Sequence, residues 1–406
     1  MSQTPTRLPL SVWSLALAMG IGMSGATIAV RIAAEFGSDL SGSAALATYP
    51  TGLQVVGVML GGLVCSRAMG RFGRKPVLLV GLAFGIAAGL IGVLAAWWQS
   101  YLILFPAHFC LGLYLANIAL LRFTAADQVA GPMSARALSL TLFGGVIAAF
   151  IGPGFVYGAN LISEDLYYGI SYGFIALVAA GVWLVIALTP IKGNADRQDQ
   201  SAPKLNTPLP PYMSMPYITA VLTGAVGYGV MALLMTAAAL YMKQLNTDGG
   251  MHDGHFGSNV RTFAIMWHVV AMFAPMIILP RLAEWIGLKR LMLLGAGLLI
   301  FSASLGLISS SPTFLYAALI ALGLGWAATY GAGGILVKQV VPDEARFVAQ
   351  GRNEFIVALF AGIGSAGAGP IFSGLGWAPM NWAAIALVAL LIPLILGLGH
   401  RSTLTN

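Results

Sequence analysis

Residues 77–96 read VLLVGLAFGIAAGLIGVLAA, an unbroken apolar stretch that decides the fold class. Its length matches the roughly 20 residues that a helix needs to cross the hydrocarbon core of a bilayer. A strand of a membrane barrel would instead alternate apolar and polar side chains over about 10 residues. Because a backbone in lipid must satisfy its own hydrogen bonds, this stretch predicts a transmembrane helix.

Similar stretches recur from one end of the chain to the other. The 406 residues are 58% hydrophobic and only 8% charged, with a mean hydropathy of +0.87, whereas soluble domains carry about 25% charged residues. A water-soluble protein is therefore excluded, and the first apolar run continues too far for a cleaved signal peptide. The predicted fold class is an all-α membrane protein with twelve transmembrane helices, at residues 10–34, 44–66, 76–96, 101–121, 136–160, 166–189, 215–242, 260–282, 288–308, 312–336, 348–372 and 379–399.

Two short motifs recur at corresponding places in the two halves of this pattern. Gly73-Arg74-Lys75, between the second and third helices, matches Gly287-Leu288-Lys289 between the eighth and ninth. Gly152-Pro153 in the fifth helix matches Gly369-Pro370 in the eleventh. Parallel repeats of six helices, with a site between them near the middle of the membrane, are a recurrent design of transport proteins.

The repeat and the charges together predict the domain organisation. Two pseudo-symmetric six-helix bundles are expected at 1–189 and 215–406, joined by a polar cytoplasmic linker at 190–214. With the N-terminus inside, all of the 20 Lys and Arg residues except Arg31, Lys243 and Arg261 fall on the cytoplasmic side. This bias is typical of multi-pass proteins of the bacterial inner membrane, so both termini are expected to be cytoplasmic. It also accounts for the net charge of +7 without a nucleic-acid partner.

The loop between the second and third helices carries a family resemblance. Residues 70–76, Gly-Arg-Phe-Gly-Arg-Lys-Pro, resemble the cytoplasmic signature of the major facilitator superfamily, normally written Asp-Arg-x-Gly-Arg-Lys, and residues 284–289 resemble a weaker second copy. The resemblance covers essentially the whole chain and implies the major facilitator fold. Gly70 stands where the family has Asp, so one of the two gates between the halves is expected to be weaker.

A narrower similarity concerns bacterial transporters of the riboflavin-importer type within this superfamily. It rests on Ala125-Ala126-Asp127, Ala135-Arg136-Ala137 and Gly144-Gly145 in the first half, and on Trp267-His268 and Met272-Phe273 in the eighth helix. The fourth helix departs in sequence from the pattern of the wider family. His108 stands before Gly112 where many proton-coupled members carry an Arg, so the usual argument for proton coupling does not transfer.

Charged residues at the cytoplasmic ends of the helices are candidates for gating. The cations of the signature loops can bond helix ends or carboxylates of the facing half, and Asp127 corresponds to Glu344 in the repeat. Arg352 and Glu354 open the eleventh helix, where a solvated helix start and a gate fit the pattern equally well. The predicted gating residues are Arg71, Arg74, Lys75, Asp127, Arg136, Glu284, Lys289, Glu344 and Arg352.

Arg31 lies late in the first helix, and no acidic residue is predicted deep within a span. Its side chain can extend to the membrane surface, which is the favoured interpretation, or pair with Glu35 one turn on. A contact with an anionic or carbonyl-rich solute at the periplasmic mouth is the functional alternative. Because a carboxylate at mid-membrane, the usual counter-ion of a cationic drug, is missing, the charges favour a neutral solute.

Two histidines occupy similar depths in their helices. They are His108 in the fourth helix and His268 in the eighth, where Gln54 is the counterpart of His268 in the first half. They could hydrogen-bond a polar solute, and an internal helix-to-helix hydrogen bond is the equally weighted alternative. No metal site is expected, since the periplasmic residues His252, Asp253 and His255 lack a closed ligand set.

Aromatic and Met side chains within the predicted helices complete the candidate site. Tyr228, Met231 and Met235 share one face of the seventh helix by their spacing. Packing between helices explains such a face more often, whereas in a cavity it would contact a flat ring system. The predicted substrate-binding residues are Gln54, His108, Tyr228, Trp267, His268, Met272, Trp326 and Tyr330.

These observations predict a secondary active transporter for a small organic solute, with no cofactor. No metal-binding or phosphate-binding motif supports an enzyme. Import of riboflavin or a similar neutral, flat molecule is the leading interpretation, and multidrug efflux by proton antiport is the alternative. A membrane sensor or a channel without active transport represents a different class. The expected partners are the substrate, the lipid bilayer and, as candidate coupling ion, the proton; the chain is expected to act as a monomer.

Overall fold

The computed structural model describes residues 8–129, 132–191, 214–247, 258–341 and 346–398. Within these residues every regular element is a helix, as predicted. The helices before residue 191 are α1 (Leu10–Ser41), α2 (Tyr49–Phe72), α3 (Arg74–Trp97), α4 (Tyr101–Ala126), α5 (Pro132–Phe143), α6 (Gly145–Ile162) and α7 (Tyr167–Leu188). Those after residue 214 are α8 (Met215–Thr247), α9 (Ser258–Phe273), η2 (Ala274–Ile277), α10 (Leu279–Ile286), α11 (Leu288–Ile308), α12 (Pro312–Val340), α13 (Arg346–Leu375), α14 (Trp377–Ala389) and α15 (Leu391–Leu396).

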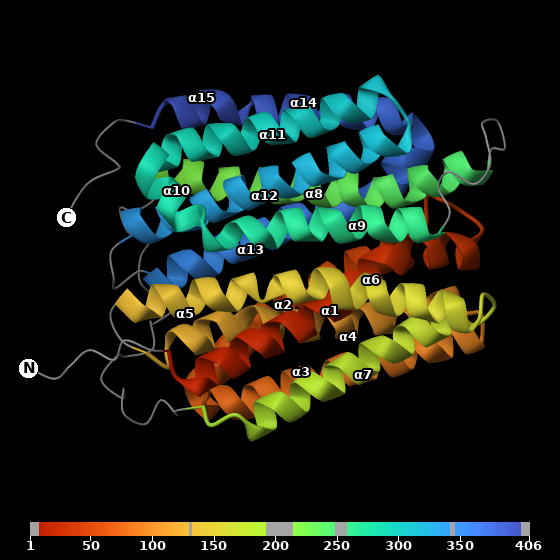
Figure 1. Cartoon of the computed structure of the whole chain (residues 1–406), viewed down its shortest axis with the longest axis horizontal. Coiled ribbons are helices and arrows are strands. Elements are labelled where there is room, and N and C mark those ends of the chain that lie inside the picture. Colours follow the sequence, from red (N-terminus) through yellow and green to blue (C-terminus); the bar gives the residue numbers. More distant parts are fainter. Residues whose placement is uncertain (1–7, 130–131, 192–213, 248–257, 342–345, 399–406) are drawn as a thin grey trace, which may run out of the picture.

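Twelve helical stretches of the described chain are long and apolar enough to cross a bilayer, which confirms the predicted number. The fifth stretch consists of α5 and α6, the eighth of α9 and η2, and the twelfth of α14 and α15. α1 begins and α15 ends at the same end of the bundle (Figure 1). We call this end the termini side and the opposite end the far side. The predicted linker, 190–214, lies almost wholly outside the described residues.

α1 is longer than the sequence predicted. The predicted helix ended at residue 34, where hydropathy falls because of Glu35 and Asp39, but α1 continues to Ser41. Gly42 then ends it with a φ of 66°, a left-handed conformation that glycine adopts at low cost after a helix. The carboxylates of Glu35 and Asp39 therefore lie on the helix rather than in a loop.

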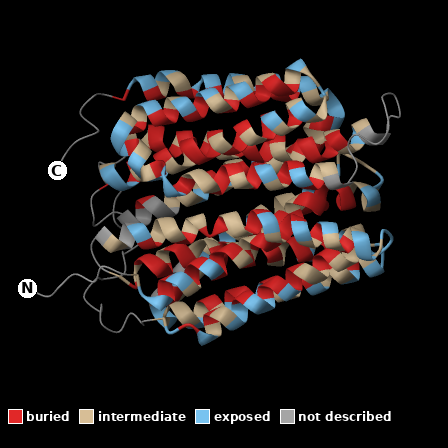
Figure 2. Ribbon diagram, viewed as in Figure 1, coloured by how far each residue is buried: buried red, intermediate tan, exposed pale blue. Residues whose placement is uncertain are grey.

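The helices pack as two groups that follow the order of the chain. α1 to α7, red to yellow-green, occupy one side of the molecule, and α8 to α15, green to blue, occupy the other (Figure 1). One apolar core is built only from side chains of the first group, and another only from the second. Buried residues line the helix faces that point toward neighbouring helices (Figure 2).

The internal repeat is visible in a matched pair of lysines. Lys75 Nζ donates to the carbonyl oxygens of Ala187, at 2.7 Å, and Thr189, at 3.0 Å. Lys289 Nζ donates to those of Leu396, at 2.6 Å, and Leu398, at 3.0 Å. The last carbonyls of a helix lack intrahelical partners, and a cation satisfies them well. Each lysine thus caps the last helix of its own group.

A second matched feature is a close helix crossing at a glycine in each group. A Cβ added at Gly112 would lie 1.9 Å from the carbonyl oxygen of Gln54, so α4 approaches the backbone of α2 at this point. In the second group, a Cβ at Gly323 would lie 2.5 Å from the carbonyl oxygen of His268, where α12 crosses α9. Gln54 and His268 thus hold equivalent places in the two groups.

The two groups meet where α2 packs against α13, where α6 packs against α9, and where α1 contacts α8 and α9. On the far side, Thr48 Oγ1 donates to the carbonyl oxygen of Ala366 at 2.9 Å and accepts from Gly369 N at 3.2 Å. The carbonyl oxygen of Ala366 lacks its usual helical partner, because Pro370, four residues on, has no N–H to donate. A proline in one group is therefore compensated by a hydroxyl from the other.

The glycine crossing predicts a stability difference between two Gly→Ala variants. Gly112→Ala should destabilise the protein by about 1–3 kcal/mol, because the added methyl group forces α2 and α4 apart. Gly181→Ala, on α7, should not, because its Cβ would have no heavy atom within 4 Å. Thermal unfolding of the detergent-solubilised variants measures the difference. Equal unfolding temperatures would show that the helices separate without penalty.

Candidate functional site

Four aromatic side chains form a cluster beside the boundary between the two groups. Trp326 and Tyr330, one turn apart on α12, stack with ring centroids 5.0 Å apart and an interplanar angle of 13°. Tyr228 of α8 meets both rings edge-on, at 5.4 and 5.8 Å, and Phe273 of α9 meets Trp326 at 5.8 Å. We call Tyr228, Phe273, Trp326 and Tyr330 the aromatic cluster.

Side chains of the first group complete the surroundings of the aromatic cluster. Met23 of α1 and Val146 of α6 pack against the apolar core that contains it. The cluster therefore lies where the two groups meet. Three of its members, Tyr228, Trp326 and Tyr330, are predicted substrate-binding residues that the structure brings together, while Phe273 comes from the adjoining span.

An ion pair between the groups adjoins the aromatic cluster. Arg122 of α4 lies with Nη2 3.1 Å from Glu354 Oε2, on α13, and its Nη1 donates to Tyr330 Oη at 3.1 Å. Tyr330 Oη in turn donates to Glu354 Oε2 at 3.2 Å. The Arg122 side chain is 10% exposed and that of Glu354 is 41% exposed. The site thus offers one cation and one anion that neutralise each other.

The indole N–H of Trp326 has no hydrogen-bond partner among the described residues, although the atom is buried. A buried donor without an acceptor costs about 1–3 kcal/mol, so such a group calls for an explanation. An acceptor on a bound molecule would supply the missing bond. Stacked rings, a free donor and a neutral ion pair together suit a flat solute with polar edges.

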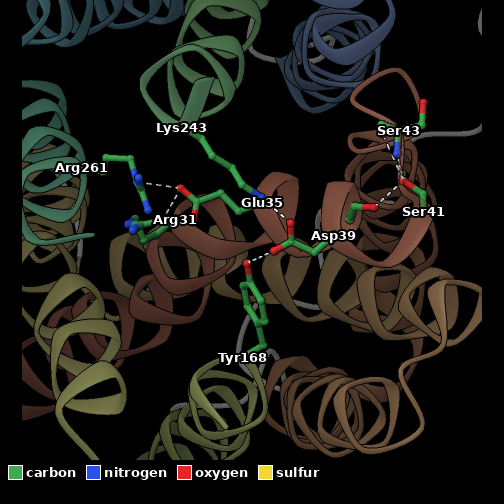
Figure 3. A network of polar contacts seen from close by, with 9 residues as sticks. Arg31, Glu35, Asp39, Ser41, Ser43, Tyr168, Lys243 and Arg261 are labelled. Atoms are coloured by element: carbon green, nitrogen blue, oxygen red, sulfur yellow. Dashed lines mark hydrogen bonds and ion pairs between the residues drawn. The ribbon is translucent and has the colours of Figure 1, made fainter. Parts of the chain in front are cut away.

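A second charged network joins the groups on the far side (Figure 3). Arg31 Nη1 lies 2.8 Å from Glu35 Oε1, and Arg261 Nε of α9 lies 3.1 Å from the same oxygen. Arg31 Nε also donates to Thr262 Oγ1 at 3.0 Å. We call Arg31, Glu35, Arg261 and Thr262, together with the outer residues described next, the far-side network.

The outer part of the far-side network centres on Asp39, one turn further along α1. Asp39 Oδ1 pairs with Lys243 Nζ of α8, and its Oδ2 accepts from Tyr168 Oη of α7 at 2.6 Å (Figure 3). α1 therefore presents Arg31, Glu35 and Asp39 along one face to both α8 and α9. These contacts join the two groups on the far side.

The favoured interpretation of Arg31 was wrong. Its side chain is 1% exposed and does not extend to the membrane surface, whereas pairing with Glu35, the other interpretation, is confirmed. The expectation that Glu35 lies outside the helix was also wrong, since its side chain is 3% exposed within α1. Charge pairing explains both errors, because an ion pair with a cross-group partner can stay buried where a single charge cannot.

The two predicted histidines make contacts between helices of their own group. His108 is fully buried; its Nδ1 lies 2.9 Å from Gln54 Oε1 and its Nε2 lies 2.8 Å from Tyr172 Oη. His268, also fully buried, has Nδ1 2.7 Å from the carbonyl oxygen of Leu319. Internal hydrogen bonding, the second interpretation, describes both. His108 and Gln54 are brought together, but away from the aromatic cluster.

Two other predicted binding residues lie apart from the rings of the cluster. Trp267 is 45% exposed, like Phe263 one turn earlier on α9. Met272 is buried and belongs to the same apolar core as the cluster, without a place in its ring contacts.

The predicted gating residues fall into several environments. Arg74 pairs with Asp127, within the first group, and its Nη1 lies 3.5 Å from Thr124 Oγ1. Lys75 and Lys289 are the helix caps described above.

The remaining predicted gating residues differ in their exposure to solvent. Arg71, Arg136 and Glu284 are exposed, and Arg352 is half-buried. Glu344 lies outside the described residues, as do the loop residues His252, Asp253 and His255.

Comparisons with known proteins cover nearly the whole chain. No family model matches it. The riboflavin transporter RfnT of Brucella anthropi is 31% identical over 388 residues, which cover 95% of this chain and 94% of that protein. The MFS-type transporter YddS of Bacillus subtilis is 25% identical over 398 residues, or 92% and 87% of the two chains. The chain belongs to the major facilitator superfamily.

Solved structures agree with this assignment at the level of the fold. The human organic anion transporter MFSD10 superposes with a TM-score of 0.69 at 13% identity, covering 95% of this chain and 98% of that one. The nucleoside transporter NupG gives a TM-score of 0.71 at 12% identity, with coverages of 95% and 99%. The protein is thus a multi-pass secondary transporter of the major facilitator superfamily.

Sequence reasoning missed several charged residues of this transporter. Arg122 was assigned to a loop because the predicted fourth helix ended at residue 121, one residue before it. Lys243, just after the predicted seventh helix, and Arg261, at the start of the predicted eighth, were predicted only to lie on the side opposite the cytoplasm. The i, i+4 spacing of Arg31, Glu35 and Asp39 was the available signal for a charged helix face, but it does not reveal partners on other helices.

The far-side network predicts a large stability effect for Glu35→Gln. The substitution removes the carboxylate that both Arg31 and Arg261 contact, so the protein should lose about 3–5 kcal/mol of stability. Glu164→Gln, in the exposed connection between α6 and α7, is the matched control and should behave like the wild type. Unfolding of the two variants in detergent compares them. A Glu35→Gln variant as stable as the control would contradict a structural role for this carboxylate.

Proposed function

We propose that this transporter imports riboflavin or a similar neutral, flat molecule across the bacterial inner membrane. The observation that carries the proposal is the aromatic cluster at the boundary between the groups, next to the mutually neutralised Arg122 and Glu354. Stacked Trp and Tyr rings suit an extended ring system. The 31% identity to a riboflavin transporter over 95% of the chain supports the same class of substrate.

Alternating access would take place by rocking of two six-helix halves, 1–189 and 215–406, about the aromatic cluster. The far-side network and the contact of Arg122 with Glu354 are among the inter-half contacts that such a movement would break and remake. The bias of Lys and Arg toward the termini side supports a cytoplasmic position for both termini. In this orientation the far side faces the periplasm.

Energy for the cycle would come from an ion gradient, with the proton as candidate, or from the gradient of the solute itself. We propose a monomer without cofactor or enzymatic activity.

The gating residues of this transporter would include Arg74 and Asp127, together with Arg122 and Glu354. Export of a neutral aromatic drug is the alternative that the uncharged character of the cluster supports equally well. Net uptake against a gradient would exclude a channel and a membrane sensor.

Uptake of riboflavin by a riboflavin-auxotrophic bacterium that lacks its own importer tests the function. Cells that express the wild-type protein should grow at limiting riboflavin and accumulate radiolabelled riboflavin. Trp326→Ala should reduce the initial uptake rate about tenfold or more, since loss of one stacking contact and one donor removes at least about 1.4 kcal/mol of binding. Trp285→Ala, at a site 83% exposed on α10, should leave uptake unchanged.

Expression and membrane insertion must be equal in the three strains. No uptake by correctly inserted wild-type protein would sink the importer proposal, and loss of intracellular riboflavin faster than in control cells would favour export. Equal uptake by the Trp326→Ala variant would move the substrate away from the aromatic cluster.

A further inference from the structure

We propose that Glu354 is a specificity residue that rejects phosphorylated, anionic forms of the solute, so that the transporter accepts the uncharged molecule. The inference rests on the proposed function and adds the residue that excludes the phosphorylated forms of the substrate. Its basis is Arg122, the one cation bonded to the aromatic cluster within the described residues. Both terminal nitrogens of this arginine are already bonded to groups of the protein.

Both terminal nitrogens of Arg122 are engaged by groups of the protein. Nη1 donates to Tyr330 Oη at 3.1 Å, and Nη2 lies 3.1 Å from Glu354 Oε2. The guanidinium also lies 4.7 Å from the centre of the Phe123 ring. A phosphate is usually bound through the same paired N–H groups of an arginine. In this site the Glu354 carboxylate takes the place that a phosphate would need.

Glu354 is itself held in a fixed position. Its Oε2 accepts from Tyr330 at 3.2 Å, and its Oε1 accepts from Asn353 Nδ2 at 3.3 Å. Its side chain is 41% exposed, against 10% for Arg122. The negative partner of the pair is therefore the more accessible one. The carboxylate thus offers more of its surface to a solute than the guanidinium does.

A phosphate group brings about −1.5 to −2 charges at pH 7. At the aromatic cluster it would be repelled by Glu354, and it would lose its hydration without gaining a free cation in return. A neutral solute meets neither penalty, because the Arg122–Glu354 pair has no net charge. The site therefore discriminates by charge, whichever end of the solute stacks on Trp326 and Tyr330.

Glu354→Gln separates this role from a purely structural one. The amide keeps the shape of the side chain and an oxygen that can accept from Tyr330, but it removes the negative charge. Arg122 is then an uncompensated cation beside the aromatic cluster, so a phosphorylated solute should be accepted. Tyr330→Phe breaks hydrogen bonds to the same two residues but leaves their charges in place, and it should not change selectivity.

The experiment measures binding of riboflavin and of flavin mononucleotide to the purified, lipid-reconstituted transporter by quenching of flavin fluorescence. The wild type should bind flavin mononucleotide at least tenfold more weakly than riboflavin. In Glu354→Gln this ratio should fall about tenfold or more, mainly through tighter binding of flavin mononucleotide. Glu284→Gln, an exposed carboxylate on α10, is the matched control and should keep the wild-type ratio.

A second measurement on the wild type covers the case in which Glu354→Gln does not fold. If Glu354 repels the phosphate, higher ionic strength should strengthen binding of flavin mononucleotide while leaving that of riboflavin unchanged. Weakening by salt would show attraction to a cation and would overturn the inference.

Two results on the binding ratio separate the inference from the proposed function. Equal affinities for the two flavins in the wild type, or an unchanged ratio in a folded Glu354→Gln variant, would overturn charge selection while leaving riboflavin transport intact. Absence of riboflavin binding would overturn both proposals.

Discussion

A charge buried inside a membrane protein requires a partner, because the surrounding hydrocarbon cannot solvate it. In this transporter several of these partners come from the opposite group of helices. Arg122 of α4 contacts Glu354 of α13, and Glu35 of α1 is shared between Arg31 and Arg261 of α9. Since both contacts cross the boundary, the requirement that pairs the charges also holds the two groups together. Relative movement of the groups must change these pairs.

The helices were predictable because the property that forms them is local. A stretch such as 77–96 contains within itself the length and apolarity of a span, so twelve helices followed from the sequence alone. The ends of the helices were less predictable for the same reason. Hydropathy placed Glu35 and Asp39 in a loop, although α1 continues past them, and it ended the fourth helix just before Arg122. What keeps these charges in their helices is a contact in space: Arg31 and Thr262 are 231 residues apart, and Asp39 and Lys243 are 204 apart.

The candidate site was only partly predictable, since the two halves share a backbone plan but not their side chains. Gly112 and Gly323 mark the same crossing in each group, and Lys75 and Lys289 the same helix cap. A repeat of this kind identifies equivalent positions, such as Gln54 and His268. It does not say which position faces the other group. That depends on packing of the whole bundle, which placed the rings of α8 and α12 at the boundary and left His108 inside its own group.

Two of the ion pairs between the groups, Glu35 with Arg261 and Glu354 with Arg122, differ in how much free energy their separation requires. Arg31 and Glu35 are almost fully buried, so parting Glu35 from Arg261 would leave charges in an apolar environment, which is strongly unfavourable. The Glu354 side chain is partly exposed. Water can therefore hydrate its carboxylate when Arg122 moves away, as at a surface ion pair. The aromatic cluster adjoins the second contact only. A solute bound there would act directly on the pair that is easier to separate, and the far-side network would respond through movement of α1 against α8 and α9.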